Sequence, residues 1–141
     1  MREIEWRIRF FNDGFKKELP SLYDHFKGLA LGTEMFLLDW FLSLFALSIN
    51  DIEIVSRIWD NFLLEGEVFA YKATLGILKY YEHELKLLTF DGAIKFLKKL
   101  PKDIDEDILF KTIENTSITW KEFQSAVEKQ RIADTNTEIH Q

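Results

Sequence analysis

The side chains best suited to chemistry are scattered along this chain. His25, His83 and His140 lie far apart in the sequence. His83 is followed by a glutamate, but the second histidine that a zinc-protease helix requires is missing. The chain has no cysteine, no glycine-rich phosphate loop and no nucleophile elbow. The sequence therefore predicts no metal site, no cofactor site and no catalytic residue.

Five residues around two tryptophans are candidates for contact with a partner protein or for structural roles: Asp39, Trp40, Arg57, Trp59 and Asp60. Glu53 lies four residues before Arg57 and Asp60 lies three after it, spacings at which opposite charges pair on a helix. Structural pairing is thus the favoured interpretation of Arg57. We interpret Trp40 and Trp59 as core anchors and Asp39 as a carboxylate that accepts hydrogen bonds at a helix edge.

Composition narrows the class of protein further. A chain of 141 residues, 47% hydrophobic and 15% aromatic, is long enough for one well-filled core. The net charge of −6 argues against nucleic-acid binding. The most apolar run, residues 35–47, is too short for a membrane span and contains Asp39. With no signal peptide and no cysteine, the expected location is the cytoplasm.

The hydrophobic spacing predicts an all-α fold, a compact, orthogonal or irregular array of about seven helices. One apolar helix is expected over residues 33–47 and a longer one over residues 67–87. Gly66 should stop the preceding helix in the left-handed conformation. A final helix should open at a capping box of Thr119 and Glu122 and bury Trp120, Phe123 and Val127.

The sequence also predicts which residues cap the helices and where the domain ends. Asn50 with Glu53 resembles a capping box, and Thr33, Thr89 and Asp105 are candidate N-caps. After about residue 130 the composition turns polar and aperiodic. We therefore predict one domain over residues 1–130 and a frayed polar tail over residues 131–141.

Four ordered sequence elements resemble a known family. They are Leu19-Pro20 with His25-Phe26, the tryptophan-containing helix Met35–Phe45, the Arg57-Ile-Trp-Asp60 motif, and Gly66-Glu67. Their order and spacing are similar to the second part of a TBC domain, the domain of Rab GTPase-activating proteins. The resemblance covers about residues 1–130 and implies the fold of the domain's C-terminal subdomain. One departure is Asp39, because many family members have an arginine before that tryptophan.

The family resemblance also implies a mechanism whose residues are missing here. Members insert an arginine from an Ile-x-x-Asp-x-x-Arg motif and a glutamine from a Tyr-x-Gln motif into the GTPase site. The arginine neutralises charge on the transferring phosphoryl group and the glutamine orients the attacking water. None of the five arginines or three glutamines of this chain stands in either motif.

The resemblance therefore predicts the C-terminal part of a Rab GTPase-activating domain, with both fingers in a missing N-terminal half. Such a chain is not an enzyme and is inactive alone. It would contact a Rab-type GTPase in the cytoplasm, peripheral to endomembranes through that partner. The alternatives are a catalytically inert TBC-like binding or scaffold module, and an unrelated structural helical domain.

Losing the first half of such a domain would leave apolar side chains of the first segment exposed. We therefore predict self-association through residues 3–30.

Overall fold

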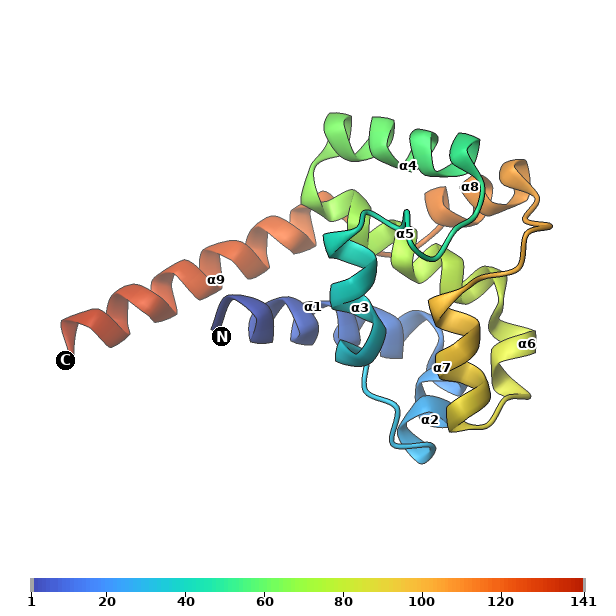
Figure 1. The fold of residues 1–141 in the computed structure, drawn as a ribbon. Helices are drawn as coiled ribbons and strands as arrows, with labels where there is room; N and C mark the ends of the chain where they lie inside the picture. Colours follow the sequence, from blue (N-terminus) through green and yellow to red (C-terminus); the bar gives the residue numbers. More distant parts are fainter. Residues whose placement is uncertain (1, 141) are drawn as a thin grey trace.

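A computed structural model describes residues 2–140, and all of its regular elements are helices (Figure 1). The predicted all-α fold is confirmed. The described residues form nine helices rather than about seven: α1 (Arg2–Glu18), α2 (Pro20–Gly28), α3 (Glu34–Leu42), α4 (Ile52–Glu65), α5 (Glu67–Tyr80), α6 (Glu82–Lys86), α7 (Phe90–Lys98), α8 (Glu106–Glu114) and α9 (Trp120–Ile139).

Helix α5 is the centre of the array. It packs against α8 and α4 most extensively and also contacts α1, α3 and α6. Residues 68–71 and 73–78 of α5 are all buried. The sequence has apolar side chains on two faces of this helix, and a helix with two apolar faces must be covered on both sides. The remaining helices surround it, with α2 against α6 and α3 against α7 (Figure 1).

A close approach of two helices in the core is made possible by a glycine. A Cβ atom placed on Gly76 of α5 would lie 2.4 Å from Ile113 Cγ1 and 2.8 Å from Ile113 Cα in α8. Real Cβ atoms do not approach other heavy atoms this closely. Gly76 therefore sets the distance between the two helices that share the largest contact.

Two predicted helices end earlier than expected. The helix predicted to reach Leu47 ends at Leu42, because Leu44 and Phe45 have φ values of 47° and 70°, outside the helical region. Phe45 is fully buried, and this burial holds the turn in place. The helix predicted to reach Leu87 stops at Tyr80, and a short helix, α6, follows. This break raises the helix count above the predicted value.

Gly66 joins α4 to α5 with an unusual backbone conformation. Its φ of 82° agrees with the predicted positive value, but its ψ of −159° differs from the left-handed helical conformation. This region of the backbone map is accessible almost only to glycine. No heavy atom lies within 4 Å of a Cβ built there, so the backbone conformation alone requires glycine.

The N-cap predictions are largely correct. The side chains of Thr89, Asp105 and Thr119 accept hydrogen bonds from the first turns of α7, α8 and α9. The cap of α4 is Asp51 and not Asn50, since Asp51 Oδ1 accepts from the backbone N–H groups of residues 53 and 54. Thr33 precedes α3 without capping it, because its hydroxyl donates to Asn12 Oδ1 at 2.8 Å.

The first segment is packed inside the chain. Trp6, Phe11 and Phe15 of α1 are buried, as are Leu22 and Phe26 of α2. The expectation that this segment exposes its apolar side chains is therefore wrong for these residues. Other helices of the same chain cover them, so a missing half is not needed to bury them.

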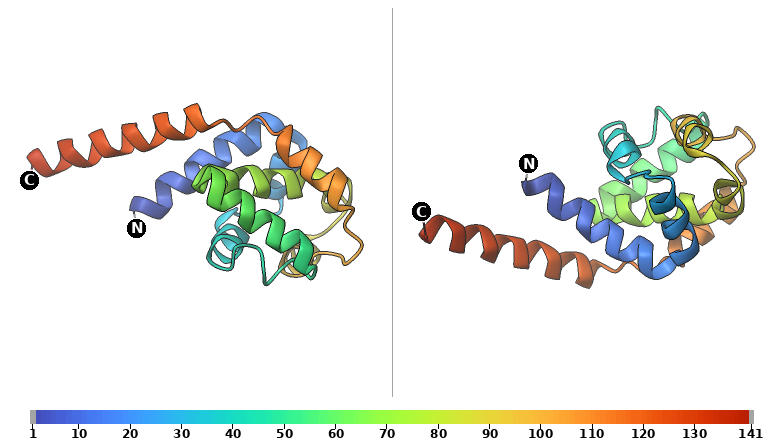
Figure 2. Two further views of the ribbon diagram at one scale, coloured as in Figure 1. Left: turned by 90° about the horizontal axis from the view of Figure 1, so that it is seen from above. Right: turned by 90° about the horizontal axis from the view of Figure 1, so that it is seen from below.

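Helix α9 leaves the body of the molecule as an extended arm that runs beside α1 (Figure 2). The prediction that it buries Trp120 and Val127 is wrong, because Trp120 is 57% exposed and Val127 is also exposed. Phe123 does pack inward, with its ring 6.1 Å from Trp6 and 5.6 Å from Phe10. The helix continues to Ile139, beyond the predicted end of the domain at residue 130. The domain limit and the fraying of the tail stay predictions.

Within residues 2–140, no helix combines the length and the hydrophobicity needed to cross a lipid bilayer.

Candidate functional site

Trp40 belongs to the core. It is 1% exposed, and its indole Nε1 donates to the carbonyl oxygen of Leu97 in α7 at 3.0 Å. Its ring contacts Phe36 at 5.1 Å and Phe45 at 5.7 Å between centroids. Trp40 therefore joins α3, the following turn and α7, and it offers no surface to a partner.

Trp59 lies on the surface, so its assignment as a core anchor is wrong. It is 44% exposed, and its Nε1 donates to the carbonyl oxygen of Leu44 at 2.9 Å. Ile52 and Leu63 lie on the same side of α4, and both are more than three-quarters exposed. These three side chains, which we call the α4 face, form an apolar stripe on the outside of the molecule. Apolar surface of this kind is typical of protein interaction sites.

Trp59→Ala should change the free energy of unfolding by no more than about 1 kcal/mol, because it removes one exposed hydrogen bond and partly exposed surface. Urea unfolding followed by circular dichroism measures this. A loss of about 3–5 kcal/mol, typical of a buried tryptophan, would instead place the side chain in the core.

Arg57 and Asp60 are neighbours on α4, but their side chains have different surroundings. The guanidinium group of Arg57 lies 3.3 Å from Glu106 Oε1 and 4.0 Å from the ring centre of Phe110, both in α8. The predicted pairing with Glu53 or Asp60 is wrong, since the partner is 49 residues away. Asp60 is exposed next to the α4 face and makes no ion pair with the described residues.

Asp39 is exposed on α3 at the edge of a hollow of about 280 Å³. Phe36, Ile94 and Leu97 contribute apolar lining, and Lys98 lies at the same hollow. The backbone carbonyl of Asp39 accepts hydrogen bonds from Ser43, but its carboxylate has no hydrogen-bond partner among residues 2–140. The carboxylate therefore faces solvent, and the hydrogen bonds predicted for it at the helix edge are not formed with these residues.

Glu67, which follows the interhelix glycine, has a structural role. Its Oε2 accepts from Arg7 Nε at 3.0 Å and from the Tyr71 hydroxyl at 2.7 Å. Burial and the hydrogen bond to Glu67 raise the pKa of Tyr71. Burial opposes the charge of Arg7, but hydrogen bonds to Glu67 and Glu3 outweigh it and raise the pKa of Arg7. The network ties α1 to the start of α5.

The structure does not bring the five predicted residues together into one constellation. Only Trp59 and Asp60 share a surface, on the outside of α4. The exposure of Ile52 and Leu63 was not predicted, because their apolar character indicates burial. Their helical spacing is visible in the sequence, but spacing does not show which of two apolar stripes faces the core.

The geometry defines the molecule as an all-α domain with an exposed apolar helix face. The sequence model of the Rab-GTPase-TBC domain family matches residues 1–86. Drainin of Dictyostelium discoideum is 35% identical over 111 residues, which are 78% of this chain and 25% of that protein. TBC1 domain family member 14 of Rattus norvegicus is 34% identical over 120 residues, which are 82% of this chain and 17% of that protein.

TBC1 domain family member 12 of Mus musculus is also 34% identical, over 129 residues that are 87% of this chain and 18% of that protein. The chain belongs to the Rab-GTPase-TBC domain family. It spans a quarter or less of the length of these relatives.

Proposed function

We propose that this chain is the C-terminal, supporting part of a Rab GTPase-activating TBC domain. It contributes fold and GTPase contact, while the arginine and glutamine fingers come from a segment outside this sequence. Alone, it does not accelerate GTP hydrolysis. Its location follows from its partner, in the cytoplasm and peripheral to endomembranes. The observation that carries the proposal is the full set of second-part motifs beside the absence of both finger motifs.

The surroundings of the arginines support this proposal. Arginine fingers must be free to enter a nucleotide site and neutralise phosphoryl charge. Four of the five arginines are ion-paired within the chain: Arg2 with Asp134, Arg7 with Glu3 and Glu67, Arg57 with Glu106, and Arg131 with Glu128. Arg9 makes no ion pair with the described residues, but it lies on α1 and not on the α4 face.

A single-turnover assay tests the inactivity of the chain. GTP-loaded members of a Rab panel are mixed with excess chain, and phosphate release is followed. We expect every Rab to hydrolyse GTP at its intrinsic rate, because the chain lacks both finger motifs. An arginine finger supplied in trans would raise the rate of hydrolysis by about 10³–10⁵-fold. An increase of that order with residues 1–141 alone would mean that a finger is present here.

The α4 face is our proposed GTPase contact, together with Asp60 beside it and Asp39 on α3. Trp40 is excluded by its burial, and Arg57 is held by α8. An exposed tryptophan in an apolar stripe has the chemistry of an interface hot spot. We propose that Trp59 inserts into an apolar depression on the GTPase.

Binding of a GTP-loaded Rab panel to wild type and Trp59→Ala tests this contact. We expect the variant to bind about tenfold more weakly or worse. Trp120→Ala is the matched control, because Trp120 is also an exposed tryptophan but lies on α9. Equal loss in both variants, or no loss in Trp59→Ala, would exclude the α4 face as the contact.

The alternative function is an inert TBC-like binding or scaffold module. The exposed α4 face supports this alternative too, because an apolar stripe can bind partner proteins other than a GTPase. The two functions separate when the upstream coding sequence is read. An Ile-x-x-Asp-x-x-Arg motif and a Tyr-x-Gln motif there favour the GTPase activator, and their absence favours the binding module.

A further inference from the structure

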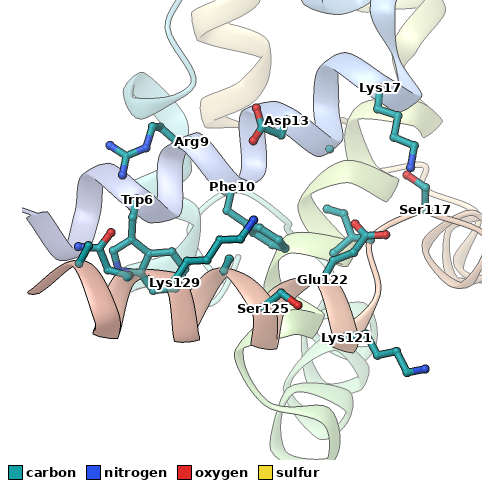
Figure 3. A pocket seen from close by; sticks show the side chains of 15 residues that line it. Trp6, Arg9, Phe10, Asp13, Lys17, Ser117, Lys121, Glu122, Ser125 and Lys129 are labelled. Carbon is teal, nitrogen blue, oxygen red and sulfur yellow. The ribbon is translucent and has the colours of Figure 1, made fainter. Parts of the chain in front are cut away.

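A groove of about 690 Å³ lies between α1 and α9, on a different part of the molecule from the α4 face. Trp6 and Phe10 of α1 point toward α9 at its floor (Figure 3). Ile118, Ala126 and Ala133 add to the apolar lining, in which Trp6 and Ile118 are themselves buried. Clefts of roughly 300–1,000 Å³ hold drug-sized ligands, which are comparable in size to a few side chains. The groove can therefore receive one face of a helix.

The rims of this groove carry charge at helical spacing. On α9, Lys121, Ser125 and Lys129 follow one another at four-residue intervals, and Lys129 extends toward α1 (Figure 3). On α1, Arg9 lies one turn before Asp13 and Lys17 lies one turn after it. These four cations make no ion pair within residues 2–140. The lining has four basic and two acidic side chains, in a chain whose net charge is −6.

The α4 face has the complementary chemistry. Beside its apolar stripe, Glu53 and Asp60 lie seven residues apart on one edge of the helix. At a rise of about 1.5 Å per residue, seven residues span about 10.5 Å, and the eight residues from Lys121 to Lys129 span about 12 Å. Neither acidic side chain is ion-paired among the described residues. Two carboxylates can thus meet two ammonium groups at matching separation.

From this match we propose that the α1–α9 groove binds the α4 face of a second copy of this chain. Ile52, Trp59 and Leu63 of one copy enter the apolar floor of the other. Glu53 and Asp60 then lie along the α9 rim, near Lys121 and Lys129. The proposal does not rest on the proposed function, because no GTPase takes part in it.

The contact is between two different surfaces of the chain. Helix α5 lies between α4 and α1 (Figure 1). One molecule therefore cannot fill its own groove with its own α4 face. A head-to-tail contact leaves one free groove and one free face on every dimer, so assembly continues to rings or open chains. The predicted self-association through residues 3–30 becomes specific here, since α1 forms one wall of the groove.

Sedimentation velocity of the full chain measures this association. From about 10 μM to about 1 mM protein at low salt, we expect the weight-average mass to rise beyond that of a dimer. Because ion pairs form the edge of the contact, raising the ionic strength from about 0.05 M to about 0.5 M should weaken it. A single monomeric species over this whole range at low salt would overturn the proposal.

Charge reversal locates the contact. The groove variant carries Lys121→Glu and Lys129→Glu, and the face variant carries Glu53→Lys and Asp60→Lys. Each alone should need at least about tenfold higher concentration to associate, because like charges then meet. The control, Lys95→Glu with Lys99→Glu, changes the charge of exposed lysines on and just after α7 and should associate as wild type does. Association of both test variants at wild-type concentrations would contradict the proposal.

Mixing the two variants guards against misfolding as an explanation. In the mixture, the acidic face meets the basic groove and the basic face meets the acidic groove. We expect the mixture to associate although neither variant does so alone. If both variants show wild-type circular dichroism and the mixture stays monomeric, the proposed pairing is wrong.

Discussion

Replacing Trp40 by alanine should lower the free energy of unfolding by about 3–5 kcal/mol. The side chain is 1% exposed and fills the space between Phe36 and Phe45. Its removal leaves a cavity and also leaves the carbonyl oxygen of Leu97 without its indole donor. Chemical unfolding monitored by far-ultraviolet circular dichroism gives this loss.

Trp40→Phe is the control that separates packing from hydrogen bonding. Phenylalanine keeps an aromatic ring but has no N–H group. We expect it to cost less than alanine, because much of the buried apolar area remains. If Trp40→Ala cost as little as the surface variant Trp59→Ala, the α3–α7 contact would not be part of the cooperative core.

Gly76→Ala should destabilise the fold by about 1–3 kcal/mol, although alanine favours helix over glycine by about 1 kcal/mol. The new Cβ would meet Ile113 at 2.4 Å and 2.8 Å, and the second of these contacts is to backbone. Helices α5 and α8 must then move apart along their largest shared contact. Gly76→Val should cost more, since it adds two further methyl groups at the same point.

Gly28→Ala is a matched control for this prediction. Gly28 also lies in a helix, α2, but no heavy atom lies within 4 Å of a Cβ built on it. Reduced freedom of the unfolded chain should make this substitution neutral or stabilising by up to about 1 kcal/mol. Thermal and urea unfolding of the two variants in parallel measure the difference. Equal effects would show that the contact with Ile113 does not set the helix distance.

The elements that depend on local chemistry could be predicted from the sequence. The caps Thr89, Asp105 and Thr119 were identified because a capping side chain bonds to a backbone N–H two or three residues later. Central α5 was identified because it is apolar on two faces, and both faces must be covered. The resemblance to the TBC family rested on four motifs in order along the chain, and it is confirmed.

Helix ends set by tertiary contacts could not be predicted in this way. Phe45 adopts a φ of 70° and is fully buried beside Trp40, although its sequence neighbours are typical of a helix. The local pattern indicated helix up to Leu47, and packing against α3 decided otherwise. Propensity is a weak determinant of structure where burial favours another conformation.

The candidate site was the least predictable part. Arg57 has acidic residues at helical spacing, yet its partner Glu106 is far away in sequence and adjacent in space. An ion pair between exposed neighbours on one helix contributes only about 0.3–0.5 kcal/mol, so such spacing does not determine where a long side chain turns. Ile52 and Leu63 show the same limit for apolar residues, since only the packed fold reveals which stripe stays outside.

Helix α9 has no buried residue, whereas α5 is buried along most of its length. Backbone amides in the two helices should therefore exchange with deuterium by different routes. In α9, local opening is sufficient, and its amides should exchange early and independently of denaturant. In α5, exchange should require global unfolding. The lowest and the highest free energies of amide opening should therefore occur in one small domain. The α9 wall of the groove can open while the core stays folded.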